Sequence, residues 1–530
     1  MSPLRHGLAV SGAVTVLLLW LAPPLSSYLI NSDHGYQLSL GALIGRGAFP
    51  YVDLVFHYGP MVAWSSALAL WGSGSLLGET VLCAVGYAAA IGCLGGVARA
   101  RLGRVAGWLV PLVAVLFLAR FYKWYFWLFP AVTLVLLHRY MADESAEDGG
   151  LIAGGVSAGL CALFRFDLGI VLLVVWLAVA MFGRAGLVAP GFARRGLIAA
   201  MGFLSPLAAW LGVLAVAGGG GAVSDYFAAT FDGGSGVVGF WSLSAPPFDA
   251  GAPFSSASGL RIALAVLPVV LLAGLLLGAW LSLRETGRPA REARFLAAAS
   301  LLGVGMLPQA YYRADAHHLL QVLPPFLLVA PLVARTAIRE AAAAPPAARS
   351  AAWAITGSLV LATLAAGVGL RSFGGSDLAP VASNGFERLG ELANGLRRDD
   401  PAALADAVRG LEATTAPDGR VLVVPMLPQV YFFAGRPMSG VLNMYTPYIL
   451  DGPRWRRRNL KHVLDHPPSA VLVSAAFLQP RSQTSRSFRR SHPELNRYLR
   501  TTFREVASAH GPWRVLHRSA RPADTDPSPR

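Results

Sequence analysis

Residues 262–283 read IALAVLPVVLLAGLLLGAWLSL, with Arg261 just before them and Arg284 just after them. A helix needs about 20 mostly apolar residues to cross the ~30 Å hydrocarbon core of a bilayer. This run meets that length and contains no ionisable side chain. It therefore predicts a membrane-spanning helix.

Similar runs recur along the chain. Of its 530 residues, 55% are hydrophobic and only 14% are charged, whereas soluble domains carry roughly 25% charged residues. By the same length criterion we expect about eleven spanning helices, near residues 8–28, 76–98, 105–120, 124–140, 151–165, 168–183, 197–217, 262–283, 295–311, 318–334 and 351–370. The shorter run 59–72, which begins at Gly59-Pro60, is expected to form an interfacial or re-entrant helix.

The basic residues predict the orientation. If the N-terminus is cytoplasmic, the inner segments hold 15 arginines, and the outer loops up to residue 370 hold six basic residues. Inner loops of membrane proteins are enriched in Lys and Arg. We therefore expect a protein of the cell (inner) membrane with its N-terminus inside and its C-terminal residues outside. The net charge of +15 then reflects topology and a basic outer surface, and no nucleic-acid partner is expected.

The chain changes character after residue 371. Residues 400–415 read as an amphipathic helix, and 420–424 (RVLVV) and 470–474 (AVLVS) read as buried strands. We therefore predict a transmembrane domain over 1–371 and a small extracytoplasmic α/β domain over 372–530. No G-x-G-x-x-G or P-loop in the α/β domain indicates nucleotide binding.

Two outer loops of the transmembrane domain are long, 29–75 and 218–258. The second is rich in Gly, Ser and Pro and carries Asp225, Tyr226, Phe231 and Trp241. Loops of this length are often lids, so it is expected either to order over an acceptor or to be disordered.

The first outer loop carries the chemistry. Residues 31–60 read NSDHGYQLSLGALIGRGAFPYVDLVFHYGP, and Tyr36, Leu40 and Leu43 fall on one face of a helix suited to the membrane surface. Asp33 follows the point where the first helix leaves the bilayer. A partly desolvated carboxylate there is placed to act as a base, or it caps the surface helix.

This loop resembles the first extracytoplasmic loop of GT-C glycosyltransferases, which include the protein mannosyltransferases and the lipid A aminoarabinose transferases. The matching residues are Asp33, Tyr36, Gly47, Pro50, Tyr51, Asp53, Tyr58 and Pro60. Two positions depart from the family pattern, since Gly59 stands where a proline is frequent and His34 stands where many members carry a second acid. The resemblance implies that Asp33 is the catalytic base or positions the acceptor.

Three further residues of this loop are candidates for substrate binding. Asp53 either contacts substrate or stabilises a tight turn, and His57 and Tyr58 either line the site or pack at the interface. Tyr36 belongs to the same candidate site.

A second segment, 311–325, reads YYRADAHHLLQVLPP. Arginine at a membrane interface binds phosphate through its planar fork, and the segment is similar to the family's segment that contacts the donor lipid phosphate. Arg313, His317 and His318 are therefore candidate ligands of that phosphate, although Arg313 could also pair with Asp315 or extend to lipid headgroups. Asp315, His317 and His318 could also be read as metal ligands, but their spacing matches no strong metal motif, so the sequence identifies no cofactor and leaves a divalent metal unsupported.

A third segment, Arg165-Phe166-Asp167, forms a short outer turn. Asp167 is a candidate for a second acid near Asp33, or it forms a plain ion pair with Arg165.

These features together predict a mainly helical, polytopic GT-C-like protein. The protein is expected to be an inverting glycosyltransferase. It would transfer a hexose or pentose from a polyprenyl-phosphate donor, embedded in the membrane lipid, to an envelope glycan, lipid or protein. A transporter or lipid flippase, or a non-catalytic envelope protein of the same fold, are the alternatives. A transporter would carry ionisable residues at mid-membrane and inverted repeats, neither of which the sequence indicates.

Overall fold

The structure is a computed structural model. It describes residues 2–21, 32–73, 75–118, 121–142, 147–182, 191–241, 256–312, 316–342, 402–445, 450–510 and 513–519. The chain divides into two compact units. The helical unit comprises Met1–Pro24, Thr80–Gly212 and Trp241–Arg388, and the loop-and-sheet unit comprises Leu25–Glu79, Val213–Phe240 and Leu389–Arg530.

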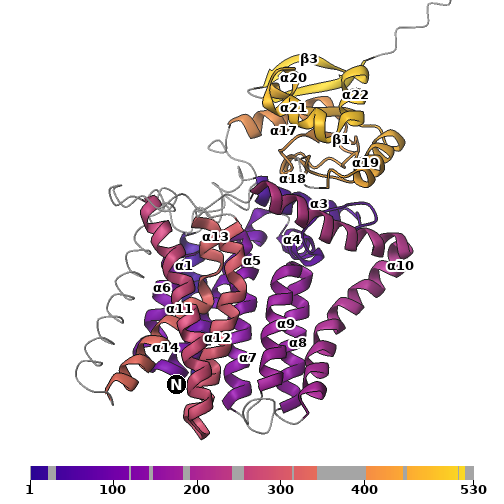
Figure 1. Ribbon diagram of the computed structural model, residues 1–530. Coiled ribbons are helices and arrows are strands. Elements are labelled where there is room, and N and C mark those ends of the chain that lie inside the picture. Colours follow the sequence, from indigo (N-terminus) through magenta and orange to yellow (C-terminus); the bar gives the residue numbers. More distant parts are fainter. Residues whose placement is uncertain are drawn as a thin grey trace, which may run out of the picture. The chain divides into compact units, whose positions relative to one another are not determined.

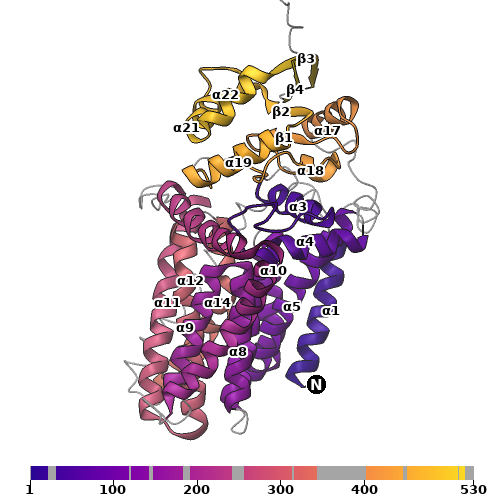
Figure 2. The same cartoon turned by 90° about the vertical axis from the view of Figure 1, so that its right-hand side faces the viewer.

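The helical unit is built from helices that run alongside one another in both ribbon views (Figures 1 and 2). Its described elements are α1 (Pro3–Leu21), α5 (Leu76–Leu102), α6 (Arg104–Leu116), the 3₁₀ turn Phe121–Lys123, α7 (Tyr125–Ala142), α8 (Glu147–Phe164), α9 (Phe166–Phe182), the first part of α10 (Phe192–Trp241), α11 (Ser256–Arg284), α12 (Gly287–Tyr312), α13 (Ala316–Gln321) and α14 (Leu323–Ala342).

Small residues let these helices pack closely, as is common between membrane helices. A Cβ on Gly278 of α11 would lie 2.6 Å from the backbone nitrogen of Ala297 on α12. A Cβ on Gly7 of α1 would lie 2.8 Å from the carbonyl oxygen of Gly92 on α5. Any larger side chain at these two positions would push the helices apart.

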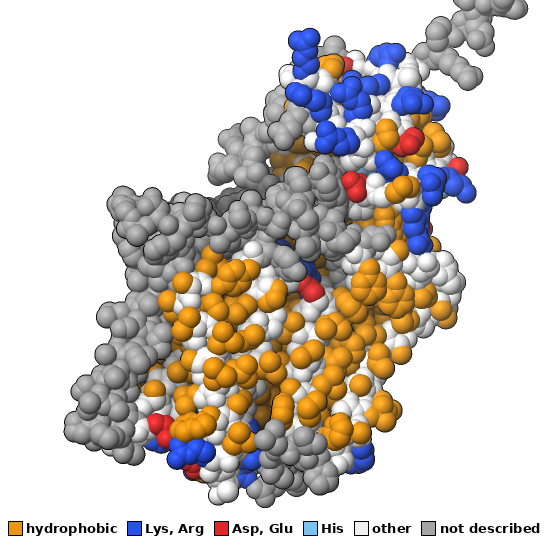
Figure 3. Space-filling view, in the orientation of Figure 1, with side chains coloured by type: hydrophobic (Ala, Val, Ile, Leu, Met, Phe, Trp, Pro, Cys, Tyr) orange, Lys and Arg blue, Asp and Glu red, His pale blue; other side chains and the backbone are white. Residues whose placement is uncertain are grey.

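The outer surface of the helical unit is suited to lipid. Five of the described helices are long and apolar enough to cross a membrane: Pro3–Trp20, Leu76–Leu102, Phe192–Phe231, Leu264–Arg284 and Gly287–Tyr311. Shorter apolar helices cover Arg104–Leu116, Asp148–Phe164 and Phe166–Phe182. On the face seen in Figure 3, hydrophobic side chains cover the helices, and the charged side chains lie toward the ends of the helices.

The predicted spans coincide with helices in ten of eleven cases, from α1 to α14. The eleventh, 351–370, lies outside the described residues. The total of eleven spans and the cytoplasmic N-terminus remain predictions. The short run 59–72 forms α4 (Pro60–Ser73), whose 14 residues extend only about 21 Å at 1.5 Å per residue.

The loop-and-sheet unit contains α3 (Ser32–Gly45), α4 and the second part of α10, together with a C-terminal α/β fold. The sheet has the order β1-β2-β4-β3, with β1 parallel to β2 and the other pairs antiparallel. Its strands are β1 (Val421–Val424), β2 (Ala470–Ser474), β3 (Phe503–His510) and β4 (Trp513–Arg518), and its helices are α17 (Ala402–Thr414), α18 (Val430–Phe433), α19 (Pro453–Asp465), α20 (Ala475–Leu478), α21 (Gln483–Ser491) and α22 (Pro493–Thr502).

The predicted helix near 400–415 and both predicted strands are confirmed as α17, β1 and β2. The alternative of a disordered loop over 218–258 is wrong for residues 218–241, which continue α10; ordering over an acceptor stays a prediction. Gly219 has φ 64° and ψ −163°, so the helix breaks there and then resumes. Ala222, Tyr226 and Ala229 are buried at helical spacing, which gives this part a packed face. Residues 242–255 lie outside the described part.

Candidate functional site

Helix α3 carries Asp33 in its first turn. The partial positive charge of a helix N-terminus favours a carboxylate there. The helix ends in a turn in which the amide of Gly47 donates to the carbonyl of Ile44 at 2.9 Å. Gly47 has φ 96°, a conformation that glycine adopts without strain. The sequence thus defines both ends of the segment that carries the proposed base.

One side of α3 packs on a buried polar cluster. The Gln37 amide donates to Ser66 Oγ at 2.9 Å and to Glu79 Oε1 at 3.1 Å. Ser66 Oγ also donates to Glu79 Oε1 at 3.1 Å, and His34 Nε2 lies 3.6 Å from the same oxygen. These four side chains are at most 2% exposed. His34, which replaces the family's second acid, therefore lies beside the carboxylate of Glu79.

The other side of α3 packs on C-terminal residues of the same unit. The Asn443 amide donates to the carbonyl of Tyr36 at 3.2 Å and also contacts Ser39 Oγ. A Cβ on Gly35 would lie 2.9 Å from Cβ and Cδ of Gln429. The prediction of a helix is confirmed, and its position at the membrane surface stays a prediction. Its polar residues are buried by partners from distant segments.

Apolar contacts complete this packing. Leu38, Leu70 and Leu76 form a buried cluster, against which Phe432 and Phe433 of α18 pack. The sequence did not indicate these C-terminal contacts, since no pattern in 429–443 marks it as a partner of α3.

Tyr36, His57 and Tyr58 come together, and Asp33 lies near enough to Tyr36 to affect its pKa. Tyr36 Oη lies 3.5 Å from His57 Nδ1, and the ring centroids of His57 and Tyr58 are 4.3 Å apart. Burial raises the pKa of Tyr36 well above its usual value, and the nearby Tyr58 and Asp33 raise it further. The Tyr36 hydroxyl thus stays protonated and can act as a hydrogen-bond donor next to the carboxylate.

Hydrogen bonds fix the conformation of the loop after α3. Asp53 accepts a hydrogen bond from the amide of Phe49 at 2.8 Å, so its carboxylate stabilises the turn. Tyr51 is fully buried with φ 63°, a conformation that costs a non-glycine residue about 1–3 kcal/mol. Its hydroxyl donates to the carbonyl of Tyr58 at 3.0 Å. The Arg458 guanidinium donates to the carbonyl of Tyr51 at 3.1 Å, which helps to hold this geometry.

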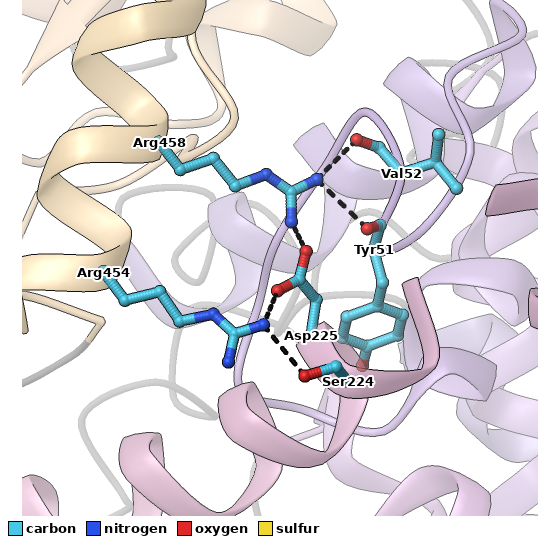
Figure 4. A network of polar contacts seen from close by, with 6 residues as sticks. All are labelled: Tyr51, Val52, Ser224, Asp225, Arg454 and Arg458. Carbon is cyan, nitrogen blue, oxygen red and sulfur yellow. Dashed lines mark hydrogen bonds and ion pairs between the residues drawn. The ribbon is translucent and has the colours of Figure 1, made fainter. Parts of the chain in front are cut away.

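The same arginine belongs to an ion-pair network (Figure 4). Asp225, on the second part of α10, pairs with both Arg454 and Arg458 of α19. Arg454 also donates to Ser224 Oγ at 3.1 Å. The Asp225 side chain is only 12% exposed, so two guanidinium groups neutralise a largely buried carboxylate. From the sequence, Asp225 is recognisable only as a residue of the second outer loop, and no pattern marks either arginine.

The remaining predicted site residues belong to the helical unit. Asp167 receives two hydrogen bonds from Arg165, at 2.9 and 2.8 Å, and Gln309 also contacts it. His318 lies in α13, the His317 side chain is not described, and Arg313 and Asp315 lie outside the described residues. No group of three or more His, Cys, Asp or Glu side chains within the described part of the chain is arranged to hold a metal ion.

No family model and no curated protein matches this sequence. Among solved structures, the chain is similar to ArnT from Cupriavidus metallidurans in the apo state, with 14% identity, a TM-score of 0.44 and 96% of each chain covered. It is also similar to the Archaeoglobus fulgidus oligosaccharyltransferase tethered with an acceptor peptide (12% identity, TM-score 0.45, 96% of this chain and 74% of the other). A third structure is the AglB oligosaccharyltransferase of the same organism in complex with an inhibitory peptide and a dolichol-phosphate. It has 12% identity and a TM-score of 0.45, and the match covers 88% of this chain and 70% of the other. All three are membrane glycosyltransferases of the GT-C class, the class that the first outer loop resembles.

Proposed function

We propose that this protein is an inverting membrane glycosyltransferase that acts outside the cytoplasm, with a polyprenyl-phosphate sugar as donor and an envelope glycan, lipid or protein as acceptor. The observation that supports it most is the position of Asp33. It lies in the first turn of a helix that is packed on both sides, near enough to Tyr36 to raise the pKa of its hydroxyl. Rigid support of this kind is what a positioned base needs.

The proposed step is a direct displacement. The acceptor hydroxyl oxygen forms a bond to the anomeric carbon while Asp33 takes its proton. The bond from the anomeric carbon to the phosphate oxygen breaks, and polyprenyl phosphate leaves with the electron pair. Attack opposite the leaving group inverts the anomeric centre. Tyr36, His57 and Tyr58 offer ring faces and hydrogen bonds to the sugar or the acceptor.

Stabilisation of the leaving phosphate is assigned to Arg313, with His317 or His318, on the sequence alone. A guanidinium offers two parallel donors to phosphate oxygens as their charge develops. The proposal also requires the N-terminus to be cytoplasmic and Asp33 to face the outside. Asp167 has no assigned role in the step, since Arg165 and Gln309 already bind its carboxylate.

Asp33→Asn tests the proposal. Asn caps a helix about as well as Asp but cannot accept the proton, so we expect normal folding and a loss of roughly 10²–10⁴-fold in rate. The assay is sugar transfer from a purified polyprenyl-phosphate donor, with a melting curve on the same sample. Full activity of a folded Asp33→Asn protein would remove Asp33 from the mechanism, whereas absence of transfer by the wild type would favour the transporter or non-catalytic alternatives.

Arg313→Ala tests the donor side in the same assay. Loss of a charged hydrogen bond should weaken use of the donor by about 1.5–3 kcal/mol. Arg313→Lys keeps the charge but loses the planar fork, so it should retain part of the activity. Donor use equal to that of the wild type in Arg313→Ala would contradict phosphate binding by this residue.

A further inference from the structure

A sizeable pocket lies inside the helical unit, far along the sequence from the proposed base. It has a volume of about 260 Å³ and is formed by α7, α9, α11 and α12. A single water needs only about 10–15 Å³ measured in this way. Most of the lining is apolar, including Val179, Leu275 and Leu301. Apolar cavities bind apolar groups rather than water.

Two arginines of α12, Arg291 and Arg294, also line this pocket. The Nη1 atom of Arg294 is buried and has no hydrogen-bond partner among the described residues. The Glu292 carboxylate, on the same helix, pairs with Arg288 at 3.3 Å. A buried guanidinium nitrogen without an acceptor is costly, so its position indicates that an anion completes the site.

The pocket is flanked by side chains suited to lipid. Phe182 of α9 is 47% exposed and Leu283 of α11 is 62% exposed, and both line it. In a bilayer these side chains would face acyl chains. The pocket also lies at the end of α12 that the basic residues predict to be cytoplasmic, where anionic lipids are concentrated and basic pockets between helices bind their headgroups.

We propose that this pocket is a binding site for an anionic phospholipid. One acyl chain occupies the apolar part, and the phosphate accepts hydrogen bonds from Arg294 and Arg291. A free phosphate ion would satisfy the arginines but leave the apolar lining unfilled, so the lipid is the occupant that matches both halves of the pocket. The site is independent of the proposed transfer reaction, because it uses none of the residues assigned to that reaction.

The test is native mass spectrometry of the purified full-length protein, titrated with phosphatidylglycerol or phosphatidylcholine in detergent. We expect the wild type to retain phosphatidylglycerol at least about tenfold better than phosphatidylcholine. Arg294→Gln should weaken phosphatidylglycerol binding about tenfold, the size expected for one charged hydrogen bond, without changing phosphatidylcholine binding. Ala279→Phe, at an exposed position of the lining, should fill the pocket and weaken binding of both lipids.

Arg284→Gln is the matched control. Arg284 belongs to the same end of the unit, but its guanidinium lies over the Trp280 ring at 4.4 Å and it does not line the pocket. The Arg284→Gln protein should therefore bind phosphatidylglycerol as well as the wild type does. Equal binding of the two lipids, undiminished binding in both Arg294→Gln and Ala279→Phe, or full competition by water-soluble glycerophosphate would overturn the proposal.

Discussion

Two helical segments of the loop-and-sheet unit are held by the same C-terminal fold but through different chemistry. Within its bounds helix α3 is held by neutral groups, namely the Asn443 amide and the packing of Phe432 and Phe433; the Arg46 guanidinium, just after it, donates to the carbonyls of Tyr431 and Arg436. The part of α10 after Gly219 is held by charge, because Asp225 pairs with Arg454 and Arg458.

The difference bears on which carboxylate can act as a base. A guanidinium beside a carboxylate stabilises its charged form and lowers its proton affinity. Asp225 has two such partners and is suited to a structural role. The neutral contacts that hold α3 involve its main chain and side chains other than Asp33. They fix the helix without placing a cation of the C-terminal fold against the Asp33 carboxylate. The two segments should therefore respond differently to substitution.

The largest effect should come from breaking the charged contact. Asp225→Asn leaves two guanidinium groups close together without their carboxylate, so the free energy of unfolding should fall by about 2–3 kcal/mol. A thermal melt of the full-length protein measures this. Arg454→Gln should cost less than Arg458→Gln, since the Arg454 side chain is 46% exposed and that of Arg458 is 26% exposed.

Ser224→Ala is the control for this network, since it removes only the bond from Arg454 and should cost under about 1 kcal/mol. Added salt should reduce the difference between wild type and Asp225→Asn, because salt screens exposed charges. A melt of Asp225→Asn that equals the wild type would show that the ion pairs do not hold α10.

The α3 and α10 segments also show what the sequence can and cannot predict. The spans were predictable because apolar length is a local property, and α3 was predictable from its helical spacing. The second part of α10 was missed because the four glycines Gly218–Gly221 are typical of the end of a helix. In the structure only Gly219 leaves the helical conformation, and the packed helix continues after it. Strands β3 and β4 were missed because charged residues such as Arg504, Glu505 and Arg514 interrupt the alternation that marks a strand.

The neutral contact of α3 is tested by Gly35→Ala. The new Cβ would lie 2.9 Å from Cβ and Cδ of Gln429, so α3 must shift, at a cost of about 1–2 kcal/mol. Because Asp33 lies two residues away, the rate of sugar transfer should also fall. Gln429→Gly in the same chain removes both clashing atoms and should restore much of both properties, which a double-mutant cycle measures.

Gly45→Ala supplies the matched comparison at the other end of α3. A Cβ there meets nothing within 4 Å, so the change should be neutral or stabilise the helix by about 0.5–1 kcal/mol. If Gly35→Ala behaves like Gly45→Ala, the contact between α3 and Gln429 is not a close one.

The candidate site was predictable only where one loop supplies it. Asp33, Tyr36, Asp53, His57 and Tyr58 fall within 31–60, so their spacing was visible in the sequence. Their supports come from residues up to about 400 positions away, as with Asn443 and Tyr36. No local pattern encodes such a contact, because it depends on how the whole chain folds.

The smallest expected effect is a change of stability with pH, which acts through the residues that pack beside Asn443. His492 packs on Tyr445 with ring centroids 5.2 Å apart, and Tyr445 hydrogen-bonds Asn459 at 3.2 Å. Asn459 in turn accepts a hydrogen bond from the amide of Leu442 at 3.2 Å, next to Asn443. Protonation of His492 would therefore disturb the neutral contacts between Asn443 and α3, and not the ion pairs of Asp225.

Burial lowers the pKa of His492 to about 4; Asp451 and Glu494 raise it and Arg456 lowers it. The unfolded chain binds this proton near its usual pKa of about 6.5, so stability is present at neutral pH and is lost as the pH falls toward 4. Between about pH 7.5 and about pH 5.5 the expected loss is about 1 kcal/mol, measured by thermal melts of the full-length protein. His492→Asn should remove most of this dependence and leave the part due to His462, whose pKa burial also lowers. An unchanged pH dependence in His492→Asn would mean that other groups set the acid sensitivity of this unit.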